Sequence, residues 1–170
     1  MRIVSVRYRL PVSYSTEIGR FISRWAHLEW VLDETLYMMI GTSPKIGRLA
    51  VMDAKIGAHL SIMEKTARLQ GITVSVNWKN LRAIMQTMES FRNKLAHGIW
   101  INDPSSKWPA FRQVKGSYTS KQGAKSVDAR IKPASMPVPL GELRNAVKGI
   151  DRANQIALAI RKEVEAQTLP

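Results

Sequence analysis

Apolar residues recur every three or four positions along most of this chain, and that helical spacing limits its possible folds more than any other feature. The pattern is clearest over residues 15–40, where its positions are Ile18, Phe21, Trp25, Leu28, Leu32, Leu36 and Met39. Residues at this spacing lie on one side of a helix and can be buried together. We therefore predict a long amphipathic helix over residues 15–40.

Two further helices are predicted before residue 100. The segment "GTSPK" favours a helix end followed by a new start, because Gly41 suits a C-terminus, Ser43 can cap and Pro44 fits a first turn. The second helix would run to Gly71 and the third from about residue 77 to 97. Their apolar faces would be Leu49, Met52, Ile56, Leu60 and Met63, then Leu81, Ile84, Met85, Met88, Phe91 and Leu95.

A fourth helix is predicted over residues 141–166, with an apolar face of Leu143, Val147, Ile150, Leu158, Ile160 and Val164. Long amphipathic helices with short joints are typical of bundles. A length of 170 residues fits one domain with its own core. We predict a mainly α fold, an up-and-down bundle of about four long helices that forms a single domain over residues 1–170.

Three segments have β-type patterns. The opening "RIVSVRYRLPV" alternates apolar and polar residues, as expected for a short strand or an extended arm. "GIWIND" and "AFRQVKG" flank a turn rich in Pro and Ser and predict a small β-hairpin before the last helix.

The net charge of +13 favours a polyanionic partner, with nucleic acid first, although the basic residues could equally solvate the surface. Residues 103–139 form a basic excursion in which Trp108, Phe111 and Tyr118 are interleaved with lysines and arginines. Such residues can follow a phosphate backbone and stack on bases; alternatively, the excursion is solvated and its aromatic residues contact the bundle. On the first interpretation the nucleic-acid contacts would include Lys94, Lys107, Arg112, Lys115, Lys121 and Lys125.

Several classes of site are excluded or disfavoured. The chain has no cysteine, which excludes disulfides and thiolate metal sites and fits a reducing compartment. No apolar run is long enough to span a bilayer, and arginines interrupt the N-terminus, so we expect a cytoplasmic protein without membrane contact. His27 and His59 lack ligand spacing, and we expect neither a metal nor a cofactor. Trp30 lies opposite the apolar stripe of the first helix, which predicts a second contact surface.

The segment "FRNKLAHG", residues 91–98, places unusual polar residues on the third helix. At about 100° per residue, Arg92 falls inside the apolar arc, while Asn93 and His97 form a polar ridge at its edge. An arginine that faces a core needs a partner. Glu29 lies within an apolar stripe of the first helix, so we predict that it pairs with Arg92 and leaves donors free for a phosphate.

A purely structural interpretation uses the same residues. The ion pair would join two helices, Asn93 would be incidental, and His97 would favour the C-terminal end of the helix dipole.

The sequence "FRNKLAHG" resembles the motif of the HEPN superfamily, in which an arginine, a polar residue and a histidine four to six positions later end a helix of a bundle. The matching residues are Arg92, Asn93 and His97, followed by Gly98. The resemblance covers residues 15–100 and the last helix, but neither the hairpin nor the basic excursion.

The resemblance implies a metal-independent endoribonuclease without a cofactor, of the kind found among toxins and antiviral effectors, which acts as a homodimer and has an antitoxin or other regulatory protein as a partner. His97 would be the general base on the ribose 2′-OH, Arg92 would stabilise the phosphorane, and Asn93 would orient the phosphate or imidazole. The alternatives are a catalytically inactive HEPN-like module that binds nucleic acid or a partner, and a basic helical scaffold.

Overall fold

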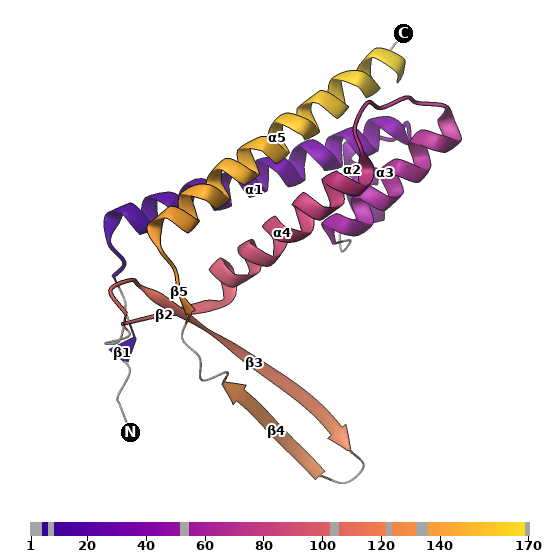
Figure 1. Ribbon diagram of the computed structural model, residues 1–170. Coiled ribbons are helices and arrows are strands. Elements are labelled where there is room, and N and C mark those ends of the chain that lie inside the picture. Colours follow the sequence, from indigo (N-terminus) through magenta and orange to yellow (C-terminus); the bar gives the residue numbers. More distant parts are fainter. Residues whose placement is uncertain are drawn as a thin grey trace.

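The computed structural model describes residues 5–6, 9–51, 55–102, 106–121, 124–131 and 136–168, with the backbone alone for 5–6, 50–51, 97, 99, 102, 111–121 and 124–131. The described residues form five helices and five short or medium strands, and helices dominate (Figure 1). The helices are α1 (Val12–Met39), α2 (Pro44–Val51), α3 (Ile56–Gln70), α4 (Trp78–His97) and α5 (Leu140–Thr168). The strands are β1 (Ser5–Val6), β2 (Gly98–Asn102), β3 (Ala110–Lys121), β4 (Ala124–Ile131) and β5 (Met136–Pro137).

The predicted helical bundle is confirmed, and α1 is its central element. The apolar stripe read from the sequence is buried, with Phe21, Leu28 and Leu36 at 0% exposure. α1 contacts α3, α4 and α5, so its one apolar side forms the middle of the core. Burial of each large side chain there contributes roughly 1.5–3 kcal/mol relative to exposure.

α5 lies beside α1 along most of its length (Figure 1). The prediction for this helix is confirmed except at Leu158, which is 39% exposed. Its buried side also contains the small residues Ala146, Ala153 and Ala157. The predicted apolar face included only large residues and so left these alanines out. Small side chains allow the two backbones to approach closely, so the interface forms with fewer large residues than we expected.

The prediction of one continuous second helix is wrong, because two separate helices occupy this segment. α2 ends at Val51 and α3 begins at Ile56, with an extended Lys55 before it (φ −65°, ψ 153°). Leu49, predicted to be buried, is 72% exposed, and Met52 lies outside the described residues. The apolar spacing continued across the break, so periodicity alone did not reveal the change in direction.

The joint between α3 and α4 is held by two side chains of α5. The amide nitrogen of Gln167 donates to the carbonyl of Thr73 (2.8 Å), and its oxygen accepts from the Thr73 N–H (2.9 Å). The carboxylate of Glu163 accepts bonds from both the backbone N–H and the hydroxyl of Ser75. Backbone groups that a helix or sheet would otherwise satisfy are thus paired in an exposed linker.

The predicted hairpin before the last helix is confirmed, and it is longer than expected. β2 pairs with β3 in antiparallel orientation, and β3 continues into a second pairing with β4. The β3–β4 pair extends away from the helices (Figure 1). β1 pairs with β2, which confirms a strand at Ser5–Val6, whereas Val4 and Tyr8 of the predicted alternation lie outside the described residues.

None of the helices in the described part of the chain combines the length and hydropathy needed to cross a membrane.

Candidate functional site

The candidate motif occupies the last two turns of α4. Asn77 caps the start of this helix, because its side-chain oxygen accepts a bond from the Asn80 N–H (3.0 Å). The helix buries Leu81, Met85 and Leu95. It ends at His97, and the next residue is already the first of β2. The helix end therefore leads directly into the sheet.

Aromatic contacts fix this helix end against the start of α1. The ring of Phe91 contacts Phe21 edge to face, with centroids 5.3 Å apart. Trp100 in β2 contacts Tyr14 in the same manner at 6.3 Å. The Tyr14 hydroxyl donates to the carbonyl of Val138 (2.9 Å), just before α5. Residues on both sides of the motif are thus anchored to α1.

Arg92 and Asn93 are both half-buried. One Arg92 guanidinium nitrogen donates to the side-chain oxygen of Asn93, at 3.2 Å. No carboxylate among the described residues forms an ion pair with Arg92. Asn93 is thus the one side chain among the described residues that bonds to this guanidinium.

The predicted pair between Glu29 and Arg92 is wrong. Glu29 is exposed and lines a groove between α1, α2 and α3, whereas Arg92 lies on α4. The helical wheel placed Glu29 between Ile22 and Leu36. Leu36 is buried at 0% exposure, but Ile22 is 38% exposed, so Glu29 lies at the outer edge of the stripe. A wheel gives angles within one helix and does not show which neighbour each angle faces.

His97 is the last residue of α4, five positions after Arg92. That separation corresponds to about 140° around the helix axis. The His97 side chain lies outside the described residues, so its predicted convergence with Arg92 stays a prediction.

Lys94 lies on another side of α4 from Arg92 and Asn93. It lines a shallow cleft with Phe91 of the same helix and Glu142 in the first turn of α5, and neither Arg92 nor Asn93 lines it. Lys94 and Arg92 therefore face different surfaces of one helix.

The basic residues predicted to bind nucleic acid extend from the motif along the hairpin. The strand register places Arg112 opposite Ile99, two residues after His97. Farther out, Lys115 is opposite Arg130, and Lys125 is opposite Ser120. The structure describes only the backbone at Arg112, Lys115, Lys121 and Lys125. Their role in binding nucleic acid therefore stays a prediction.

Lys107 precedes β3 and differs from these residues because its surroundings are described. Its ammonium lies 5.1 Å from the ring centroid of Trp108, which is 37% exposed. The basic and aromatic residues of this turn are thus in contact with each other at the surface.

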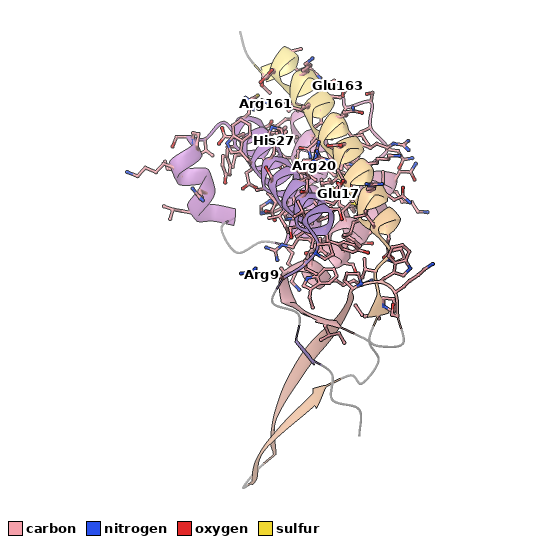
Figure 2. The ribbon with its side chains drawn as sticks, turned by 90° about the vertical axis from the view of Figure 1, so that its left-hand side faces the viewer. Arg9, Glu17, Arg20, His27, Arg161 and Glu163 are labelled. Carbon is pink, nitrogen blue, oxygen red and sulfur yellow. The ribbon has the colours of Figure 1, made fainter. Side chains whose placement is uncertain are left out.

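Several arginines on the surface along α1 and α5 are paired with carboxylates, and Figure 2 labels Arg20 and Glu17 on α1 and Arg161 on α5. Arg20 and Arg144 both pair with Glu17, at 3.3 and 3.7 Å, and Arg24 pairs with Asp151. Farther along α5, Arg161 pairs with Glu165 (2.8 Å). These arginines are poor candidates for a phosphate site in comparison with Arg92.

The remaining histidines have structural partners. Nδ1 of His59 lies 2.8 Å from a carboxylate oxygen of Asp33, and Nδ1 of His27 lies 2.6 Å from the side-chain oxygen of Asn154. His59 is buried. In the part of the chain that the structure describes, no three His, Asp or Glu side chains are placed to bind a metal ion.

Trp30 is 52% exposed, which confirms its predicted outward position. Its ring contacts the guanidinium of Arg161 at 5.5 Å and the ring of His27 at 5.8 Å. It also lines the groove that contains Glu29. Sequence reasoning missed this groove, although the acidic cluster Glu29, Asp33 and Glu34 in a basic chain was a visible signal of it.

No protein-family model matches the chain, and no match is found among curated proteins or solved structures.

Proposed function

We propose that this protein is a metal-independent endoribonuclease of the HEPN type, which cleaves RNA by attack of the ribose 2′-OH and acts in a toxin or antiviral-defence setting. The proposal rests on the motif of Arg92, Asn93 and His97 and on its position at the end of a bundle helix.

The main support for the proposal is that Arg92 has no carboxylate partner among the described residues. A half-buried arginine is normally paired with a carboxylate, as Arg82 and Arg161 are in this protein. Arg92 instead bonds only to the neutral Asn93 among the described residues. A guanidinium that is oriented by an amide and has no carboxylate partner is suited to bind a phosphodiester.

The proposed chemistry uses His97 as the general base that removes the 2′-OH proton. Arg92 stabilises the charge that develops on the phosphorane, and Asn93 holds the guanidinium in orientation. Histidine fits this role because its pKa lies near neutral pH. The 2′ oxygen forms the new bond to phosphorus while the bond to the 5′ oxygen breaks, and a proton is delivered to that oxygen.

We propose that two copies combine at the site. A separation of about 140° on one helix directs Arg92 and His97 to different sides. A twofold axis beside α4 would bring the arginine of each copy toward the histidine of the other. The second histidine would then protonate the leaving 5′ oxygen.

The β3–β4 hairpin would carry RNA that extends beyond the cleaved bond. From Gln113 to Lys121, β3 spans about 27 Å at the usual rise per residue, starting beside the motif. Because its basic side chains recur along this length, the hairpin also supports the second candidate function, a catalytically inactive HEPN-like module that binds nucleic acid or a regulatory partner such as an antitoxin.

The test is cleavage of mixed single-stranded RNA by purified protein in excess EDTA. We expect fragments with 2′,3′-cyclic phosphate ends, and no cleavage of the same sequence made with 2′-deoxyribose, because DNA lacks the attacking hydroxyl. Cleavage that chelation abolishes would contradict the proposed chemistry. Salt-sensitive retention of RNA without cleavage would establish the binding module instead, and the absence of any affinity would leave a basic scaffold.

A further inference from the structure

A groove of about 840 Å³ lies between α1, α2 and α3, away from the proposed RNA site. Its volume is in the range of small-molecule sites. The floor contains the buried residues Tyr37, Ile56 and His59, and the rim carries the exposed apolar side chains of Trp30 and Leu49. The groove thus combines buried polar groups with an apolar entrance.

The Tyr37 hydroxyl is the most unusual group in this groove. The residue is only 4% exposed, yet no described residue makes a hydrogen bond with its hydroxyl, although it lines the groove. The hydroxyl oxygen is not among the fully buried unpaired atoms of the described residues, so it is open to the groove, where a ligand atom can bond to it in place of water. A polar group in this state indicates a position for a ligand atom.

Gly47 brings α2 close enough to form the second wall. A Cβ atom at this position would lie 2.2 Å from the Tyr37 ring, so only glycine allows this approach. Gly47 is buried, whereas its neighbours Ile46 and Arg48 are exposed. α2 therefore contacts the bundle over the face of Tyr37 and directs its other side chains to the rim.

The two walls carry opposite charges. α1 contributes the carboxylates of Glu29, Asp33 and Glu34, and α2 contributes the cations of Lys45 and Arg48. Among the described residues no ion pair connects these walls, and the one carboxylate with a close partner is Asp33, which contacts His59. Anionic and cationic groups on opposite sides of one groove match a ligand that carries both charges.

The electrostatics at Tyr37 keep its hydroxyl a proton donor. Burial raises the pKa of this phenol above its usual value of 10.0, Asp33 and Glu34 raise it further, and Arg48 lowers it. Charged groups from both walls, Asp33 and Glu34 on α1 and Arg48 on α2, thus act on this one hydroxyl. At neutral pH that hydroxyl is protonated and can donate to a carboxylate.

We propose that this groove binds a small zwitterion with apolar side chains, such as a dipeptide with free termini. The ammonium group lies against the α1 carboxylates, and the carboxylate accepts bonds from Arg48 and the Tyr37 hydroxyl. The apolar side chains contact Trp30 and Leu49. This site is independent of the RNA chemistry proposed above.

Isothermal titration calorimetry with the dipeptide Leu-Leu tests the proposal. We expect binding to the full chain, and at least about tenfold weaker binding both for the C-terminal amide and for the N-acetyl form, since each lacks one charge-assisted contact. Equal affinity for the three compounds, tighter binding of a capped form, or no binding of Leu-Leu at millimolar concentration would each overturn the proposal.

Two variants connect the binding to the groove. Tyr37→Phe and Arg48→Gln are each expected to weaken Leu-Leu binding about tenfold, and Arg48→Gln should also remove the preference for Leu-Leu over its amide. Tyr37→Phe should fold with unchanged thermal stability, because the lost hydroxyl has no protein partner. Lys65→Gln, on the exposed surface of α3, is the matched control. Wild-type affinity in both groove variants would overturn the assignment.

Discussion

Replacing His97 with alanine is expected to slow RNA cleavage about 10²–10⁴-fold, because the general base for the 2′-OH is lost. Replacing Arg92 with alanine should slow it about 10²–10³-fold, because the phosphorane loses its cationic partner. The measurement is the initial rate on a labelled RNA in EDTA, with circular dichroism to show that both variants fold.

The control is Glu29→Gln, which should retain the wild-type rate because Glu29 lines the α1–α2–α3 groove and, among the described residues, forms no ion pair with Arg92. A mixture of the two inactive variants adds a further test. If each site takes Arg92 from one copy and His97 from the other, a mixed dimer has one site with both an arginine and a histidine. Its activity should exceed that of either variant but stay below wild type, because the second histidine is absent. Cleavage unchanged by either alanine substitution would mean that the activity comes from elsewhere.

Phe21→Ala is expected to lower the free energy of unfolding by about 3–5 kcal/mol, the usual range for a buried phenylalanine. Phe21 is 0% exposed and contacts the rings of Trp25 and Phe91, so its loss leaves a cavity between α1 and α4. Urea denaturation followed by tryptophan fluorescence measures the change.

The neighbouring Ile22→Ala is the matched control, because Ile22 is 38% exposed on the same turn of α1. It should cost about 1 kcal/mol or less. Similar losses for the two variants would contradict the placement of Phe21 at the centre of the α1–α4 contact.

The sequence predicted the helices most reliably where large apolar residues repeat without interruption. The stripe from Phe21 to Met39 is buried as expected, and the hairpin between α4 and α5 is present. The break before α3 was missed because residues on both sides of it continue the apolar spacing. Leu158 was misplaced because alanines, rather than large residues, form much of the α5 contact.

The candidate site was less predictable, because it depends on contacts between elements. The position of Arg92 around α4 follows from spacing within one helix, and the side chain is half-buried. The predicted partner of Arg92, Glu29, was wrong, because the rotation of α1 relative to α4 depends on the packing of the whole core. The groove at Tyr37 depends on Gly47, and a glycine in a sequence does not reveal which ring it faces.

The direct junction between α4 and β2 has a mechanical consequence. Gly98 is the first residue of β2 and follows His97 without a spacer; its φ of −86° and ψ of 137° turn helix into strand in a single step. A change in the orientation of β2 would therefore act through the backbone directly on the last turn of α4. The orientation of the His97 peptide therefore depends on the direction in which β2 leaves α4.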